Sequence, residues 1–514
     1  MQVGHPGSFV PTEYAGRPDH ERKPEGGQKK ATHLAVLAIT GVAFFVRLVS
    51  LDYQSLWRDE VDSRWFADAP YPELLRQLFA EGQNGFLYFT FLRPWITLTG
   101  ASEYALRFPS AVAGTLAVPA GYVLARQLGF GRRVGVMLAL LLATSPYLVW
   151  YSQEVKMYAI FLLVVVVALI AYLKALTGGG ARWWVAFVVA VSLSFYLHIL
   201  APLMLPVYLA IALIYWQHTR RQWRAWLGSM ACLTLPYLPL VIWQLPLLVN
   251  DYDSGHPFYP LREQTYLLLK LYSSGLVRFI GWSSIALSVF LLLVGLFLPA
   301  KPVGRLSRQR WLLAAWLLLP FWTIYLISLR VPVFEDRYLI YITPAFYLLL
   351  ALGVELMSRY SRLLAATALA LVLAVNLAGI WQQQRSPIKA DFRAAGAYLA
   401  TRQPPPDNII IQTPYLRPTF DYYYRRPYRF LAGMWTNHDQ TEADVDREMR
   451  QLTAGLTEVW LVVSEESLWD SRAMVRTWLD NNAFKADEAH FMRVDVYLYR
   501  LTPGSINSPS MGLD

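Results

Sequence analysis

The sequence predicts a polytopic α-helical membrane protein that carries a small C-terminal α/β domain outside the membrane. The first observation is composition: 55% of the 514 residues are hydrophobic and only 16% are charged, whereas soluble domains average about 25% charged residues. The second is that apolar runs long enough to span a membrane, roughly 20 residues, recur between residues 33 and 381. The third is a change near residue 385, after which short helix and strand patterns alternate.

Residues 1–32 precede the first apolar run and are rich in proline, glycine and charge. They show no hydrophobic periodicity, so we expect a disordered tail. The first run begins near Leu34, deeper in the chain than an ordinary signal peptide, and no small-residue cleavage site follows it. We therefore expect this run to remain as a membrane helix.

About eleven apolar runs predict membrane spans, and together they predict a transmembrane domain over residues 33–384. The runs lie near 33–51, 104–126, 134–150, 157–175, 183–199, 201–216, 226–249, 282–299, 311–330, 338–357 and 362–381. The gaps 52–103 and 250–281 are long enough to form substantial loops.

Basic residues predict the orientation of these spans, because lysine and arginine concentrate in cytoplasmic loops. One side of the membrane receives Arg126, Arg132, Arg133, Lys174, Arg182, Arg220, Arg221, Arg224, Lys301, Arg305, Arg308, Arg310, Arg359 and Arg362. We therefore expect a multi-pass plasma (inner) membrane protein with a cytoplasmic N-terminus, an exterior or periplasmic loop 52–103, and an exterior C-terminal domain. This distribution also explains the net charge of +10 without nucleic-acid binding.

Residues 385–503 predict the small exterior α/β domain, and residues 504–514 a disordered tail. "DFRAAGAYLATR", "EADVDREMRQLTAG" and "SRAMVRTWLDNN" have helical patterns, whereas "NIIIQT", "EVWLVVS" and "VDVYLYRL" have strand patterns. The domain carries no glycine-rich phosphate loop and no cluster with metal-ligand spacing. Because Cys232 is the only cysteine, an intramolecular disulfide and a cysteine-rich metal site are excluded.

The stretch "SLWRDEVDSRWFA", residues 55–67, places Asp59, Glu60 and Asp62 just beyond the first span. Its aromatic residues suit a membrane surface, with the acids facing a cleft. A carboxylate beside a low-dielectric surface can act as a general base with a raised pKa or hold a cation. Asp62 lies three positions after Asp59, so we expect like-charge repulsion to raise the pKa of Asp59. The alternative is a solvated acidic loop.

The short turn "WYSQEVKMYA" carries Glu154 and Lys156 on the same predicted side. An acid at the mouth of a helix bundle indicates a functional site or a buried ion pair. Pairing with Lys156 or with Arg107 is therefore the alternative reading of Glu154.

Two further positions share that side. His198 ends the fifth span, where an interfacial hydrogen bond is the alternative to ligand binding. Arg337 and Tyr338 enter the tenth span, and arginine suits bidentate phosphate contacts. Pairing of Arg337 with the acids at 335–336 is the alternative. Acids and bases gathered on one membrane face, without midplane charges, favour interfacial chemistry over transport, which more often uses interrupted helices and midplane ionisable groups.

At these positions the sequence resembles the GT-C class of polyprenyl-phosphate-sugar-dependent glycosyltransferases, the dolichyl-phosphate-mannose protein mannosyltransferase-like family that includes aminoarabinose transferases. The resemblance lies in "VRLVSLDYQSLWRDE", "SEYALRFPSAVAG", "SPYLVWYSQEVKMYA", "FYLHILAPLMLP", "DRYLIYITPAFYLLLALG" and "DFRAAGAYLATRQPPPDNIIIQTPY", in order over about residues 35–425. The family's Asp-Glu pair falls on Asp59 and Glu60, and its acid after the third span falls on Glu154.

This resemblance implies transfer of a sugar from a polyprenyl-phosphate donor to a protein, lipid or polysaccharide acceptor on the exterior face, usually with inversion. Asp59, Glu60 and Glu154 are then the catalytic candidates, with Asp59 activating or positioning the acceptor. The donor phosphate would contact Arg337, Tyr338, Lys156 and His198. No cofactor is required, no metal site is predicted, and a divalent metal ion stays open.

One departure from the family concerns the first loop, where members often carry a His-Pro-Pro or similar motif. Here "EGQNGFLYFTFLRPW" places Gln83 and Asn84 at that point, and either could supply a neutral hydrogen bond instead. The predicted substrate-binding residues are Gln83, Asn84, Tyr151, Gln153 and Arg107.

Two alternatives of other classes remain at the level of sequence. The first is a transporter or flippase of lipid-linked saccharides, which would share the groove and the cationic residues but would not need Asp59. The second is a non-catalytic scaffold with an exterior binding domain. Replacement of Asp59 by Asn separates them, because it should abolish turnover in an enzyme and leave transport or binding largely intact.

Overall fold

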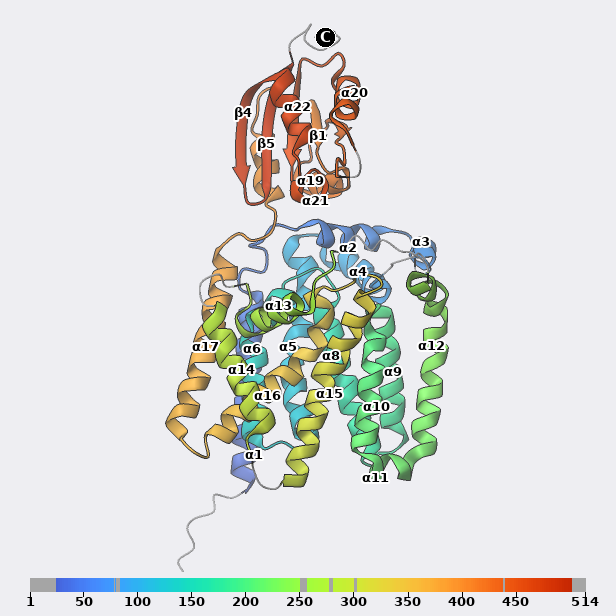
Figure 1. The fold of residues 1–514 in the computed structure, drawn as a ribbon, viewed down its shortest axis with the longest axis vertical. Helices are drawn as coiled ribbons and strands as arrows, with labels where there is room; N and C mark the ends of the chain where they lie inside the picture. Colours follow the sequence, from blue (N-terminus) through green and yellow to red (C-terminus); the bar gives the residue numbers. More distant parts are fainter. Residues whose placement is uncertain are drawn as a thin grey trace, which may run out of the picture.

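The computed structural model describes residues 25–77, 79, 84–249, 257–276, 281–299, 303–437 and 440–501. It consists of a large helical bundle with a five-stranded sheet domain stacked on one end, here called the domain end (Figure 1). Helix α1 begins at Glu25, so the last part of the predicted N-terminal tail is helical. The predicted C-terminal tail, 504–514, lies outside the described residues.

Each predicted span coincides with a helix or a helix pair. The bundle contains α1 (Glu25–Leu48), α5 (Glu103–Gln127), α6 (Arg132–Thr144), α7 (Pro146–Ser152), α8 (Tyr158–Leu176), α9 (Ala181–Leu197), η1 (Ala201–Met204), α10 (Leu205–Ile214), α11 (Trp216–Thr219), η2 (Arg220–Gln222), α12 (Trp223–Val249), α14 (Gly281–Phe297), α15 (Val303–Ser328), η3 (Asp336–Ile342), α16 (Thr343–Met357) and α17 (Arg362–Arg385). Within the described residues, 7 helices are long and apolar enough to cross a membrane, or 8 if a bent pair counts as one span. The protein is therefore a multi-pass membrane protein, and the total of eleven spans stays a prediction.

The bent pair is α6 and α7, which the apolar pattern predicted as one continuous run. Their axes differ by 57° at a break beside Ser145 and Pro146. Proline cannot continue the helical hydrogen-bond ladder, because it lacks the amide hydrogen and clashes with the preceding turn. The Ser145 hydroxyl instead accepts the Leu148 amide at 3.2 Å and caps α7. Beyond the bend, α7 packs against α5 and α17.

The described parts of the predicted exterior gaps are largely helical. They contain α2 (Arg58–Asp68), α3 (Tyr71–Gln77), α4 (Phe86–Thr99) and α13 (Leu261–Ser274). These helices lie at the domain end in Figure 1. Helix α2 includes the acidic stretch, so its carboxylates lie on a fixed helix rather than a solvated loop.

The C-terminal domain is a mixed sheet with the strand order β2-β1-β3-β5-β4. Its strands are β1 (Asn408–Ile411), β2 (Arg429–Ala432), β3 (Glu458–Val463), β4 (Ala483–Phe491) and β5 (Val494–Leu501), and its helices are α18 (Phe392–Ala400), η4 (Pro414–Leu416), α19 (Arg417–Tyr423), α20 (Glu442–Thr453), α21 (Glu466–Trp469) and α22 (Met474–Asn482). β1 runs parallel to β2 and β3, whereas β5 is antiparallel to β3 and β4. The three predicted strands and three predicted helices are present, and the two edge strands, β2 and β4, were not predicted.

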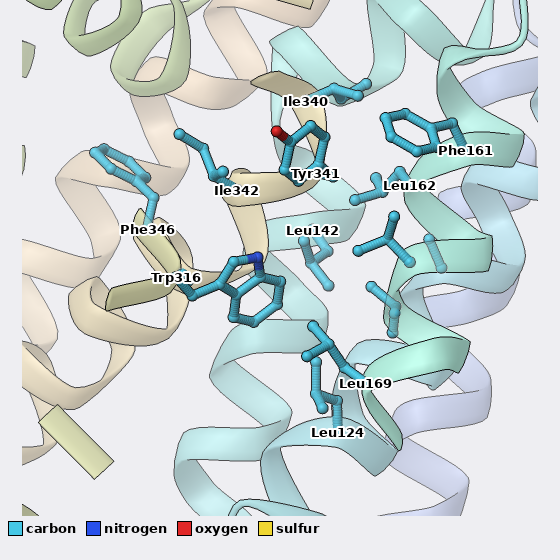
Figure 2. Close-up of a cluster of buried hydrophobic side chains, with 14 of the residues drawn as sticks. Leu124, Leu142, Phe161, Leu162, Leu169, Trp316, Ile340, Tyr341, Ile342 and Phe346 are labelled. Carbon is cyan, nitrogen blue, oxygen red and sulfur yellow. The ribbon is translucent and has the colours of Figure 1, made fainter. Parts of the chain in front are cut away.

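A buried apolar core fixes the elements that reach the domain end. Figure 2 shows one buried cluster that includes Trp316 of α15, Phe346 of α16, Leu142 of α6 and Leu169 of α8. Because η3 precedes α16 directly, this core also fixes the position of η3, whose Tyr341 is fully buried. Side chains on η3 therefore start from a rigid support.

Candidate functional site

A cavity of about 810 Å³ lies between the bundle and the C-terminal domain. The bundle contributes Trp57, Arg58, Trp150, Tyr151, Glu154, Leu276 and Arg337; the segment after α17 contributes Ile388, Lys389 and Ala390; and the domain contributes Phe392, Leu416, Val463, Ser464, Glu465, Glu466, Ser467, Leu468, Arg493 and Asp495. Six segments that are separated in sequence thus supply its charged groups. Glu154, Tyr151 and Arg337 are the predicted site residues among its lining.

Asp59 lies beside this cavity between two arginines. One of its carboxylate oxygens is 3.6 Å from Arg58 Nε, and the other is 3.6 Å from Arg337 Nη2. Burial raises the pKa of Asp59, but the positive charges of Lys156, Arg337 and Arg58 outweigh burial and hold the pKa below its ordinary value. The expected raised pKa is therefore contradicted. Asp59 is ionised at neutral pH and better suited to positioning than to strong base catalysis.

The nearby cations also explain why repulsion from Asp62 does not raise the pKa of Asp59. Asp62 shares Arg58 with Asp59, because Arg58 Nε is also 3.6 Å from an Asp62 oxygen. The shared arginine offsets the repulsion between the two acids. Asp62 itself has a raised pKa, mainly because it is buried.

Glu60 is fully buried and holds several elements together. Arg107 of α5 binds both of its oxygens at 2.8 Å, in the two-pronged geometry that arginine and carboxylate favour. Lys389 Nζ lies 2.9 Å from Oε2, and the Val155 amide donates to Oε1 at 3.0 Å. Burial raises the pKa of Glu60, but the charges of Arg107 and Lys389 lower it to about 2. With every oxygen engaged, Glu60 is placed to position the site rather than to contact substrate.

Glu154 shares Lys389 with Glu60. Its Oε1 lies 3.2 Å from Lys389 Nζ, while its Oε2 is buried without a hydrogen-bond partner among the described residues. Burial raises the pKa of Glu154 above its ordinary value. The predicted pairing partner, Lys156 or Arg107, is instead Lys389. Glu154 lines the cavity, and a ligand hydroxyl there could donate a hydrogen bond to this unpartnered oxygen.

Arg337 is the principal cation on the bundle wall. Its guanidinium contacts Asp59, lies 3.9 Å from a Glu335 oxygen, and stacks 5.5 Å from the Trp57 ring centre. Its Nε is buried and has no hydrogen-bond partner within the described chain. The neighbouring Asp336 side chain instead accepts the Tyr151 hydroxyl at 2.8 Å.

His198 and Tyr338 form an aromatic group behind Arg337. The His198 ring lies 4.9 Å from the Tyr338 ring and is stacked on Phe161 at 5.1 Å. His198 Nδ1 accepts the Leu200 amide at 3.1 Å, so Nε2 carries the proton of the neutral ring. Nε2 is buried without a partner among the described residues. Because unsatisfied buried polar atoms cost on the order of 1–3 kcal/mol each, those of Glu154, Arg337 and His198 favour a ligand that completes them.

The predicted substrate-binding residues occupy different settings. Tyr151 lines the cavity. Arg107 donates to the carbonyls of residues 51, 54 and 55 as well as to Glu60, and Gln153 donates to the Arg47 and Val49 carbonyls at 3.0 Å. Asn84 Oδ1 accepts the Ile199 amide at 2.9 Å. These contacts support the fold around the cavity, and Gln83 lies outside the described residues. Lys156 is partly buried and acts on Asp59 through its charge.

Three charged or aromatic residues of the site were missed in the sequence. Lys389 follows the last span and bridges two buried acids, and Arg58 stacks 4.6 Å above the ring of Tyr415 from the C-terminal domain. No spacing pattern in the sequence relates Lys389 to Glu60 or Glu154, because these acids lie far from it in the chain. The contact between Arg58 and Tyr415 depends on the tertiary structure, so the spacing of residues in the sequence does not predict it. Within the described residues, no group of three or more His, Cys, Asp or Glu side chains could hold a metal ion.

Comparison with solved structures supports the predicted fold. ArnT from Cupriavidus metallidurans in the apo state matches with a TM-score of 0.55 and 14% identity, over 93% of this chain and 100% of that chain. The same enzyme bound to undecaprenyl phosphate gives a TM-score of 0.54 at 15% identity, over 92% and 99%. The archaeal oligosaccharyltransferase AglB from Archaeoglobus fulgidus, in complex with an inhibitory peptide and a dolichol-phosphate, gives 0.52 at 10% identity, over 94% and 75%.

Sequence comparison adds a partial match. A family model described as dolichyl-phosphate-mannose-protein mannosyltransferase matches residues 84–243. No curated protein sequence matches the chain. The resemblance found in the motifs is thus confirmed by a family model over part of the chain and by the fold over nearly all of it. The chain has a GT-C-like fold and is similar, over residues 84–243, to the dolichyl-phosphate-mannose-protein mannosyltransferases.

Proposed function

We propose that the protein is an integral-membrane glycosyltransferase that moves a sugar from a polyprenyl-phosphate donor to an acceptor at the domain end of the bundle. The observation that carries this proposal is the cavity in which Arg58, Arg337 and Lys389 gather beside Asp59 and Glu154. Cations in a partly buried site suit a phosphate, and a carboxylate beside them suits an acceptor hydroxyl. The similar structures with undecaprenyl phosphate and dolichol-phosphate bound support this donor class.

The chemistry requires one bond to form and one to break. The acceptor oxygen attacks the anomeric carbon of the sugar while the bond from that carbon to the phosphate oxygen breaks, which gives inversion. Asp59 accepts a hydrogen bond from the acceptor hydroxyl and orients its lone pair, and the proton leaves to solvent or to the departing phosphate. Arg337 stabilises the charge that develops on the polyprenyl phosphate. Each group thus has a task that fits its charge at neutral pH.

The orientation proposed from the basic loops places the transfer reaction on the exterior side of the membrane. The N-terminus is cytoplasmic and the domain end is exterior or periplasmic in the plasma (inner) membrane, with residues 33–384 in the membrane domain and 385–503 in the exterior domain. Reporter fusions at Gly179 and Gly433 should report opposite sides of the membrane. The same side for both contradicts the proposed orientation.

Asp59 provides the direct test. We expect Asp59→Asn to lower turnover by at least about a hundredfold, because positioning or proton-transfer help is typically worth about 10²–10⁴ in rate. The assay uses purified protein in nanodiscs with a synthetic polyprenyl-phosphate sugar and measures release of polyprenyl phosphate. Asp62→Asn is the matched control, since it shares Arg58 but lies away from Arg337 in the ion-pair network. Near-normal transfer by Asp59→Asn would exclude this role.

A further inference from the structure

A second polar cavity lies at the end of the bundle opposite the domain. It has a volume of about 540 Å³ and opens where α6 begins and α16 ends. Arg132 and Arg133, at the start of α6, and Arg359, just after α16, supply its basic wall. Glu355 is its one acidic lining residue. Three guanidinium groups against one carboxylate leave the cavity positively charged.

The arginines of this cavity are not consumed by ion pairs. Among the described residues, no carboxylate lies within 4.0 Å of Arg132, Arg133 or Arg359. The start of α6 adds to the charge, because Gly131 provides no side-chain cap for the first-turn amides. Uncapped amides and the positive end of the helix dipole favour an anion.

Four other basic side chains at this end have aromatic or carbonyl partners. Lys174 lies 4.0 Å from the ring centre of Trp183, where Arg182 also stacks, and Arg224 stacks on Trp223. Arg126 donates to the Phe130 carbonyl. Topology signals alone would distribute charge over the loops in this way. The cavity differs from that pattern, because Arg132 and Arg133 of α6 line it together with Arg359 from the turn after α16.

The cavity also has an apolar side. Phe130, Val134, Leu306 and Leu352 line it, and the last three belong to α6, α15 and α16. A free phosphate ion would make no favourable contact with that apolar surface. A phospholipid would place its glycerol and the first methylenes of its acyl chains there. Basic pockets between membrane helices are typical of anionic headgroup binding.

We propose that this cavity binds the phosphate headgroup of an anionic phospholipid from the adjacent leaflet. Arg132 and Arg133 contact the phosphate together with the first-turn amides of α6, and Arg359 closes the site from α16. Such a lipid joins α6, α15 and α16 where the long arginine side chains would otherwise repel one another. This site is independent of the transfer reaction, so it stands or falls separately from the proposed function.

Native mass spectrometry of the full chain tests this proposal. The test variant is Arg132→Gln/Arg133→Gln/Arg359→Gln, and the matched control is Arg220→Gln/Arg221→Gln/Arg224→Gln at the same end. With phosphatidylglycerol, we expect the test variant to retain at least about tenfold less bound lipid than the control, because it loses the three charges that line the cavity, whereas the control loses three charges outside it. Phosphatidylcholine should bind both variants equally weakly.

Competition and folding controls make every outcome decisive. Inorganic phosphate should fail to displace phosphatidylglycerol at equal concentration; displacement would replace the lipid by a soluble anion as the ligand. If the two triple variants retain equal amounts of phosphatidylglycerol, the cavity does not bind the lipid, and its arginines serve only to orient the protein in the membrane. If the triple variant does not fold, the single variant Arg359→Gln gives the same comparison, with Arg220→Gln as its control.

Discussion

At the scale of the residue, the adjacent acids Asp59 and Glu60 have different tasks because they point in different directions from α2. Neighbours on a helix project about 100° apart. Glu60 therefore faces Arg107 and Lys389 in the interior, whereas Asp59 faces Arg337 beside the cavity. The sequence shows two adjacent acids here, but their spacing does not tell which one faces the interior.

Glu60 should make stability depend on acid pH. Its pKa is about 2 in the folded protein, below the ordinary value of 4.5, because Arg107 and Lys389 favour its charged form. A depressed pKa gives stability that is present above the ordinary value and lost as pH falls from about 4.5 toward about 2. Glu60→Gln should lose this dependence and, at about pH 7, be destabilised by about 3–5 kcal/mol, because it leaves buried cations unpaired.

Chemical unfolding in detergent between about pH 7 and pH 3 measures this effect. Glu73→Gln, at a partly exposed acid on α3, is the matched control and should follow the parent protein. Parallel pH profiles for the parent and Glu60→Gln would show that the ion-pair cluster does not stabilise the fold.

Arg337 should be sensitive to the shape of its cation as well as to its charge. Lysine keeps the charge but lacks the planar fork that can bind a phosphate through two nitrogens. We expect Arg337→Lys to raise the donor KM several-fold and Arg337→Ala to lower kcat/KM further. Donor titrations in the nanodisc assay measure both, with Arg262→Lys, exposed on α13, as control. If Lys and Ala both behave like the parent, Arg337 only neutralises Asp59 and Glu335.

At the scale of the element, two helices of the bundle approach closely at glycines. A Cβ added to Gly353 of α16 would lie 2.2 Å from the Leu291 carbonyl oxygen of α14, and one added to Gly295 of α14 would lie 2.4 Å from the Leu349 carbonyl oxygen. Both contacts are to backbone, so neither neighbour can rotate away. These glycines allow α14 to pack against the helix that follows η3.

We therefore expect Gly353→Ala to destabilise the bundle by about 1–3 kcal/mol, the usual cost of overpacking a core. The thermal unfolding midpoint in detergent should fall accordingly. Gly228→Ala on α12 is the matched control, because an added Cβ there meets nothing within 4 Å. An unchanged midpoint for Gly353→Ala would mean that α14 can shift away from α16 without loss.

The apolar pattern predicted the bundle well because membrane spans are long and strongly apolar. Such a run is recognised even where the residues at its ends are ambiguous. It missed the α6–α7 bend, since Pro146 lies inside a run that remains apolar on both sides. It missed β2 and β4 because each lies at an edge of the sheet, where one side has no strand partner and polar residues are tolerated. It missed Lys389 because that lysine acts through acids 235 and 329 residues away in the chain.

At the scale of the whole molecule, the C-terminal domain is fastened to the bundle through Glu103 at the start of α5. Arg393 of α18 and the Tyr423 hydroxyl of α19 both bind the Glu103 carboxylate. Arg393 also donates to the Asp52 carbonyl at 2.7 Å, and Gln54 donates to the Ser386 carbonyl at 2.8 Å. The segment after α17 and the domain thus both form hydrogen bonds with the segment that joins α1 to α2. Movement of the domain would be transmitted to the start of α2.

Tyr415 carries this coupling into the site. Its ring supports the Arg58 guanidinium at 4.6 Å, and its hydroxyl is held by Glu465 and Trp469 within the domain. Arg58 in turn contacts Asp59 and Asp62. A cation over an aromatic face gains about 0.5–2 kcal/mol. The domain therefore supplies one wall of the cavity and also supports one of the cations that keep Asp59 ionised.

Replacement of Tyr415 should separate these roles. Tyr415→Ala removes the ring, so Arg58 loses its support and turnover should fall by about tenfold, with the donor KM little changed because Arg337 is untouched. Tyr415→Phe keeps the ring and should restore most of that loss, which a general packing defect in the domain would not do. Phe484→Ala, exposed on β4 away from the cavity, should behave like the parent. If Tyr415→Phe is as impaired as Tyr415→Ala, the hydroxyl contacts inside the domain, rather than the ring beneath Arg58, maintain the site.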